Sequence, residues 1–170
     1  MDLFRVHASV PGFQNSLILS AACKINLKKN MHSLVIDDNE TMREAMAQIL
    51  QKEKWTVVTA ADGESGLTQL KTGSFDLVVT DYRLPGMNGL AVLKAVKSHS
   101  PRTEVLVITA YGTIDLAVEA MHHGAIDFIT KPFSHDEFKL RIRKIAAKIS
   151  SDEELERVSA ENAYLRNELE

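Results

Sequence analysis

The sequence has little of what marks secreted, membrane-spanning or nucleic-acid-binding proteins. Its single cysteine among 170 residues allows no intrachain disulfide and predicts a reducing, cytoplasmic compartment. No stretch approaches the roughly 20 apolar residues that a membrane-spanning helix needs, so we expect no contact with a membrane. The net charge of −3 is too small for the overall field to attract nucleic acid, and we predict no direct nucleic acid binding by this chain.

Motifs for nucleotide hydrolysis and DNA reading are also missing. The sequence contains no Gly-x-x-x-x-Gly-Lys-Ser/Thr phosphate loop, and no helix-turn-helix pattern follows residue 150. What is present is ordinary for a globular protein, with 45% hydrophobic and 25% charged residues. The length predicts one compact domain with an extension.

Short apolar runs alternate with amphipathic stretches from Ser33 onward. This alternation predicts βαβ units, because parallel neighbouring strands need crossover connections. Five units predict an α/β fold, a flavodoxin-like (βα)5 doubly wound parallel sheet of order 2-1-3-4-5, with a C-terminal helical extension. We expect strands at 34–36, 56–60, 75–80, 105–108 and 126–130, and helices at 39–51, 62–70, 88–98, 115–122 and from 134.

Polar residues stand at the C-terminal ends of four of these expected strands. Ligands of such sheets bind beyond those ends. Clustered carboxylates need a compensating cation, and oxygen-only ligands favour Mg²⁺. A carboxylate beside Mg²⁺ is a workable nucleophile for phosphoryl transfer, and an ammonium group suits a phosphoryl oxygen. The residues concerned are Asp37, Asp38, Asp81, Thr109 and Lys131.

Each of these residues alone has a simpler interpretation. Asp38 or Asn39 would cap the following helix, and Asp81 would open the turn before Pro85. Lys131 would be a solvated loop lysine. Their joint placement on one rim of the sheet favours a phosphoryl site instead.

The sequence from Ser33 to about Ile149 resembles a response-regulator receiver domain. Five separated blocks carry the resemblance, in the order that the family has them. They are Val35-Ile36-Asp37-Asp38, Leu77-Val78-Val79-Thr80-Asp81, Leu84-Pro85-Gly86-Met87-Asn88-Gly89, Thr109-Ala110-Tyr111-Gly112 and Lys131-Pro132-Phe133.

The resemblance implies a role for each matching residue. Asp81 would accept a phosphoryl group from a partner histidine kinase with Mg²⁺, and the chain would not be an enzyme beyond slow self-dephosphorylation. A cis peptide bond before Pro132 is also implied. The implied Mg²⁺ ligands are Asp37, Asp38, Asp81 and the backbone carbonyl of Arg83. The implied phosphate-reading and switch residues are Thr109, Lys131 and Phe128.

Within the family, residues 110–121 and 124–128 are similar to the NtrC-type subgroup. The stretch 161–166 also resembles the linker of those regulators. This implies that the parent protein carries an effector ATPase and DNA-binding domains that activate sigma-54 transcription. We therefore interpret the chain as the regulatory part of a longer protein.

The sequence divides into three parts. We interpret residues 1–30 as an N-terminal extension, disordered or not native, with a short added strand or helix as the alternative. Residues 31–149 form the receiver domain, and 150–170 a linker helix. Apolar residues of that helix step by alternating 3 and 4, with one asparagine among them, which favours a two-stranded coiled coil and a homodimer. A helix packed on its own receiver is the alternative. The dimerisation residues are Leu155, Val158, Asn162, Leu165 and Leu169.

Other functions explain less of the sequence. A haloacid-dehalogenase-type phosphatase would share the Asp nucleophile and Mg²⁺, but Asn39 replaces its expected general acid and Asp81 is left unexplained. An interaction module that takes no phosphate would not need the complete acid set. A flavodoxin-like FMN carrier is disfavoured because anions occupy the phosphate position. Whether phosphorylation releases or locks the dimer is open.

Overall fold

The structure is a computed structural model that describes residues 30–110 and 112–168. The predicted extension therefore lies outside the described residues except for its last position, and so does Leu169.

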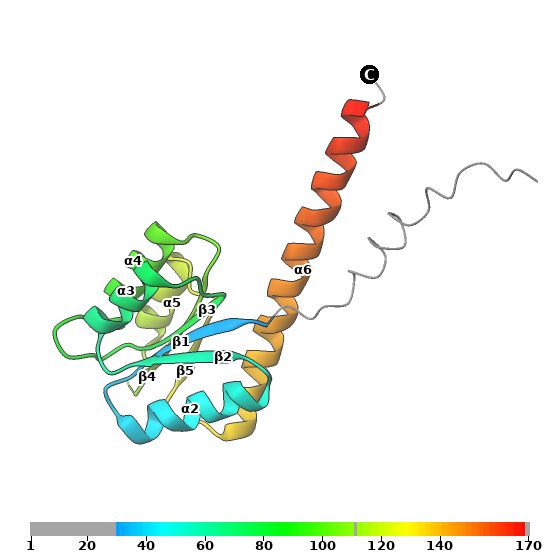
Figure 1. Cartoon of the computed structure of the whole chain (residues 1–170). Coiled ribbons are helices and arrows are strands. Elements are labelled where there is room, and N and C mark those ends of the chain that lie inside the picture. The colour runs from blue at the N-terminus through cyan, green and yellow to red at the C-terminus, as the bar shows by residue number, and fades with distance from the viewer. Residues whose placement is uncertain (1–29, 111, 169–170) are drawn as a thin grey trace, which may run out of the picture.

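Five parallel strands form one sheet of order β2-β1-β3-β4-β5. The predicted fold class is confirmed, and element boundaries differ from the predicted ones by at most two residues. The C-terminal end of the long last helix projects beyond the rest of the described chain (Figure 1). In chain order the elements are β1 (His32–Ile36), α2 (Glu40–Lys52), β2 (Thr56–Ala60), α3 (Gly63–Thr72), β3 (Leu77–Asp81), α4 (Gly89–His99), β4 (Glu104–Thr109), α5 (Ile114–His122), β5 (Asp127–Thr130) and α6 (His135–Glu168).

Helices cover both faces of the sheet, as expected for the predicted doubly wound fold. Successive strand residues point to opposite faces, so each strand contributes to two clusters. In β1, Val35 joins the cluster under α2 and α6, whereas Leu34 and Ile36 join the cluster under α3, α4 and α5. Each strand thus holds both layers of helices in place.

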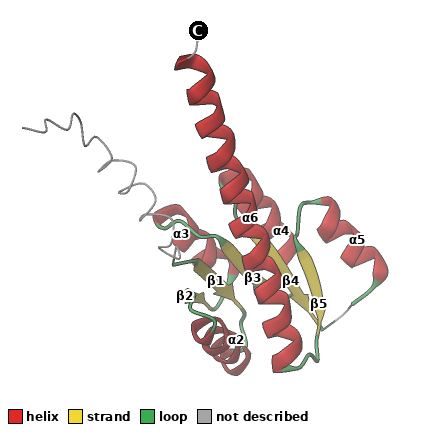
Figure 2. Cartoon of the chain, turned by 90° about the vertical axis from the view of Figure 1, so that its right-hand side faces the viewer, coloured by secondary structure: helices red, strands yellow, loops and turns green. Residues whose placement is uncertain are grey.

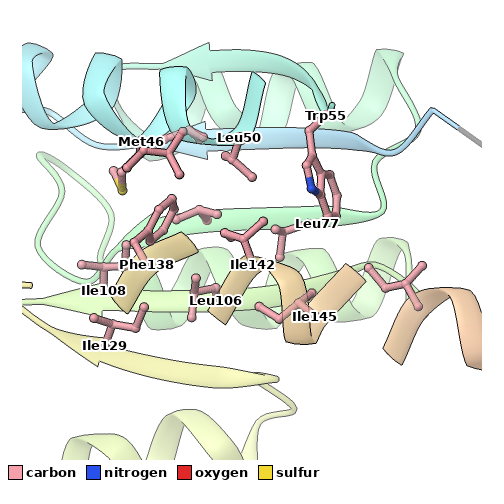
Figure 3. Packing of buried hydrophobic residues seen from close by; sticks show 14 residues of the cluster. Met46, Leu50, Trp55, Leu77, Leu106, Ile108, Ile129, Phe138, Ile142 and Ile145 are labelled. Atoms are coloured by element: carbon pink, nitrogen blue, oxygen red, sulfur yellow. The ribbon is translucent and has the colours of Figure 1, made fainter. Parts of the chain in front are cut away.

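The buried aromatic side chains lie in the cluster under α2 and α6. Phe138 is fully buried at the start of α6, and Trp55 closes the far end of the layer (Figure 3). Ile142, Ile145 and Ile149 follow Phe138 at helical spacing and lie on the same face of α6. The first half of α6 is therefore a core helix of the domain.

Beyond Ile149 the same helix continues without interruption to Glu168 and leaves the sheet (Figure 2). Its apolar side chains become exposed there: Leu155 is 69% exposed and Leu165 is 49% exposed. Surface ion pairs such as Lys148 with Glu104 and Arg102 with Glu156 connect the start of this part to the domain. In the part of the chain that is described, no helix is long and apolar enough to cross a membrane.

Candidate functional site

The C-terminal strand ends bring the predicted polar residues to one edge of the sheet. Asp37 and Asp38 follow β1, Asp81 ends β3, and Thr109 ends β4. Asp81 pairs in register with Ile108, and Thr109 pairs with Thr130, the last residue of β5. Lys131 comes directly after that residue. The five residues of the sequence prediction are thus brought to the same edge.

Three carboxylates meet at this edge. One oxygen from each of Asp37, Asp38 and Asp81 lies within 4.8 Å of the others. Asp37 is fully buried, Asp81 is 8% exposed, and Asp38 is exposed. Three carboxylates this close repel one another unless a cation offsets their charge.

Lys131 supplies one such cation, so it is not a solvated loop lysine. Its ammonium nitrogen lies 2.8 Å from Asp37 Oδ2 and 2.7 Å from Asp81 Oδ2. Burial lowers the pKa of Lys131, but the hydrogen bonds and charges of Asp37 and Asp81 outweigh it, so the pKa is raised above 10.5. The contribution of these bonds to stability is therefore present at neutral pH and is lost only as the pH rises through that raised pKa. The Lys131–Pro132 bond is cis, as predicted.

Backbone hydrogen bonds hold the loop between β1 and α2. The amide of Asn39 donates to Asp37 Oδ1 at 2.9 Å, and the amide of Asp37 donates to the carbonyl of Ala60. Asn39 caps α2 by accepting from the amide of Met42, so Asp38 does not serve as the cap. Within the described ranges, no hydrogen bond or ion pair reaches the Asp38 carboxylate.

The chemistry of these groups fits a magnesium ion. Mg²⁺ prefers carboxylate oxygens and keeps several waters, so it needs exposed as well as buried ligands. Asp38 offers an exposed carboxylate that no other described residue bonds, beside the more buried Asp37 and Asp81. The amide of Arg83 donates to Asp81 Oδ1 at 3.3 Å, which brings the Arg83 backbone next to the same cluster.

The predicted switch residues lie beside the cluster, on β4 and β5. Thr109 is fully buried, and its carbonyl accepts from the amide of Lys131. Phe128 is half-buried and packs against the cluster of apolar side chains under α3, α4 and α5. Phe128 pairs in register with Val107 on β4, two residues before Thr109.

Two residues near the site were given no role from the sequence, although one of them, Gly89, ends a block that carries the family resemblance. Arg43 in α2 donates from Nη1 to the carbonyl of Asp37 at 2.7 Å. A cation in the first turn of a helix opposes the helix dipole, and this was the one signal that Arg43 has a specific partner. Gly89 is the second residue. A Cβ atom there would lie 2.3 Å from the carbonyl oxygen of Asp81 and 2.7 Å from the Cα of Tyr82.

Replacing Gly89 with alanine is expected to slow phosphorylation of the chain and to destabilise it by about 1–3 kcal/mol. The added methyl group would meet backbone atoms of Asp81 itself, which must shift and carry the carboxylate with them. Urea unfolding and the rate of modification by acetyl phosphate measure the two effects. Gly73→Ala is the matched control, because its methyl group would meet only the Phe75 ring and the Gln69 carbonyl at 3.2 Å or more. Equal rates for the two variants would contradict the expectation.

Comparison with known families gives a match over residues 33–143, to the response regulator receiver domain. Among curated proteins, the C4-dicarboxylate transport transcriptional regulatory protein DctD of Rhizobium meliloti is 35% identical over 136 residues, 80% of this chain and 28% of that protein. The transcriptional regulatory protein FixJ of Bradyrhizobium diazoefficiens is 39% identical over 105 residues, 62% of this chain and 51% of that protein. The chain thus spans about half or less of these relatives.

Solved structures give the same result. The beryllofluoride-activated NtrC4 receiver domain dimer is 32% identical, with a TM-score of 0.66 over 69% of this chain and 98% of that one. NtrX from Brucella abortus, in complex with ADP, is 33% identical, with a TM-score of 0.69 over 75% of this chain and 29% of that one.

Proposed function

The chain belongs to the response regulator receiver domain family of two-component systems, and on that premise we propose that Asp81 is its phospho-acceptor. A partner histidine kinase supplies the phosphoryl group, in the cytoplasm. The observation that carries the proposal is the cluster of three carboxylates with Lys131 bonded to two of them at one edge of the sheet.

In the proposed reaction a carboxylate oxygen of Asp81 attacks the phosphorus of a phosphohistidine. A P–O bond forms as the P–N bond breaks, and the donor imidazole leaves with the electron pair and takes up a proton. Lys131 neutralises charge on the phosphoryl oxygens, and the Thr109 hydroxyl donates to one of them. Asp37, Asp38, Asp81 and the carbonyl of Arg83 would hold Mg²⁺, which supplies positive charge to offset that of the phosphoryl group.

The test is the stoichiometry of modification. Incubation with acetyl phosphate and MgCl₂ is expected to add one phosphoryl group per chain, read from the intact mass, and none without Mg²⁺. Slow loss of that group, with no steady turnover of a phosphomonoester, is expected of an acceptor. Sustained turnover would favour a phosphatase instead and contradict the proposal.

We propose that β5 passes the change at the site to α6. Phe128 moves as Thr109 engages the phosphate, and it stands next to Asp127 in this strand. The Asp127 carboxylate accepts from the amide of Phe128 at 2.8 Å and is 2.5 Å from Nη1 of Arg141 in α6. The switch strand is thereby bonded to the helix that continues into the linker. A displacement of β5 would shift the equilibrium position of α6.

The exposed half of α6 serves as a dimerisation helix in this proposal. Leu155, Val158 and Leu165 are 41–69% exposed although all three are apolar. A helix of this length without tertiary packing is marginal in water, so pairing with a second copy would stabilise it. Asn162 among them favours two strands in fixed register.

Replacing Leu165 with aspartate is expected to convert the chain from dimer to monomer at micromolar concentration, because the charge would be buried in the helix pair. Sedimentation equilibrium measures the change. Ala160→Asp is the matched control, since residue 160 lies on the opposite side of the heptad and should leave the dimer intact. The proposed helix pair would be contradicted if the unsubstituted chain were a monomer, or if both variants dimerised equally.

The parent protein is proposed to be a transcriptional regulator of the NtrC type, with an ATPase and DNA-binding domains acting with sigma-54. Two observations support this subgroup: the sequence similarity at residues 110–121 and 161–166, and the NtrC4 and NtrX structures among the similar ones. The sequence that follows residue 170 in the parent protein tests it, and an ATPase phosphate loop is the expected finding.

A further inference from the structure

Arg43 contacts the loop that carries two of the three carboxylates. It lies in the first turn of α2, is half-buried, and donates from Nη1 to the carbonyl oxygen of Asp37 at 2.7 Å. That oxygen belongs to the peptide group between Asp37 and Asp38. Arg43 therefore fixes the orientation of this peptide plane.

The two acids depend on that peptide to different degrees. The Asp37 carboxylate is held on both oxygens, by the amide of Asn39 and by Lys131. Asp38 is exposed, and no residue in the described part of the chain bonds its carboxylate. Without such a bond, the position of the Asp38 carboxylate depends on its rotamer and on its backbone, and Arg43 holds the peptide plane that leads into that backbone.

The helix dipole alone would not place a cation here, although the three carboxylates of the site attract one. A positive charge in the first turn of a helix is opposed by the helix dipole. A positive charge beside a magnesium site also repels the incoming ion. The hydrogen bond from Arg43 to the Asp37 carbonyl explains the position of Arg43. It stabilises this arrangement against both unfavourable effects and fixes the geometry of the loop.

We propose that Arg43 is a positioning residue for the Mg²⁺ ligand Asp38, an inference that rests on the proposed function of the site. Arg43 touches neither the ion nor the phosphoryl group. It acts through the Asp37–Asp38 peptide, so its removal lets the exposed carboxylate sample directions in which it does not bind the ion.

The test is the Mg²⁺ affinity of the unphosphorylated full chain, measured by calorimetric titration with MgCl₂. For Arg43→Met the dissociation constant is expected to rise about tenfold, a typical effect of losing a residue that orients a metal ligand. If Arg43 acted only through its charge, the dissociation constant would fall instead, because removal of a cation that repels Mg²⁺ would tighten binding. The direction of the change therefore separates positioning from charge.

Lys52→Met is the matched control. It removes one positive charge from the same helix at an exposed position, and it is expected to leave the dissociation constant unchanged or slightly lower. Arg43→Lys keeps the positive charge and a hydrogen-bond donor, but its side chain is shorter. Its Mg²⁺ dissociation constant is therefore expected to lie between those of the wild type and Arg43→Met. If Arg43→Met does not fold in urea titrations, Arg43→Lys carries the test, and an affinity equal to wild type then contradicts the proposal.

Unchanged or tighter binding by Arg43→Met would overturn the positioning role, and so would equal weakening by Arg43→Met and Lys52→Met. A wild-type chain that binds no Mg²⁺ would overturn the proposed function itself. The two failures are therefore distinguishable in a single set of titrations.

Discussion

Replacing Asp81 with asparagine is expected to abolish phosphorylation of the chain by acetyl phosphate. The amide has nearly the shape of the carboxylate but lacks the anionic oxygen that attacks phosphorus. Asp37 and Asp38 would remain, but the first is buried and bonded on both oxygens, and the second is proposed to hold the metal. Neither replaces Asp81 as the nucleophile.

Intact mass spectrometry after incubation with Mg²⁺ measures this loss. Asp136→Asn removes an exposed carboxylate from the first turn of α6 and is expected to be phosphorylated like the parent chain. Circular dichroism establishes that the Asp81→Asn variant is folded. Phosphorylation of a folded Asp81→Asn chain at the wild-type rate would exclude Asp81 as the acceptor.

Replacing Lys131 with methionine is expected to destabilise the Mg²⁺-free chain by about 3 kcal/mol at neutral pH. Lys131 is the cation bonded to the fully buried Asp37 and to Asp81, so its loss leaves two close carboxylates without compensation. Saturating MgCl₂ is expected to restore much of the lost stability, because the ion compensates the same carboxylates. The variant should also bind Mg²⁺ more tightly than the parent chain, since a repelling charge has been removed.

Urea unfolding with and without MgCl₂ measures both effects. Lys144→Met changes the same residue type at an exposed position of α6 and is expected to alter neither stability nor its response to Mg²⁺. Equal stability of Lys131→Met and Lys144→Met in the absence of the ion would show that the bonds of Lys131 contribute little. If Mg²⁺ does not restore the stability of Lys131→Met, the ion and Lys131 do not compensate the same carboxylates.

Much of the fold was predictable because the strands are short, apolar and separated by helices of regular period. Leu77-Val78-Val79 is a continuous apolar run, which is typical of a strand buried on both faces, and these residues divide between the two clusters. Boundaries were less predictable, since the terminal residue of an element depends on caps and pairing. Asp81 was expected after its strand, whereas its pairing with Ile108 places it within β3.

The candidate site was predictable as a set of strand-end residues, but its internal contacts were not. Lys131 is adjacent in sequence to neither Asp37 nor Asp81, and only the closed sheet brings them together. The roles of Arg43 and Gly89 could not be predicted from the sequence. Arg43 bonds a backbone carbonyl, and Gly89 is required because a Cβ atom there would clash with the backbone of Asp81. Side-chain periodicity carries no information about either kind of contact.

Asp81 is proposed to carry the phosphoryl group, and chemical reduction tests this directly. Reduction of the phosphorylated chain with borohydride converts an aspartyl-phosphate into homoserine, which peptide mass spectrometry locates in the sequence. Homoserine is expected at position 81 alone, and none is expected in a chain incubated without acetyl phosphate. Homoserine at position 37 or 38 instead, or a phosphorylated chain with no reduced aspartate, would contradict the proposal.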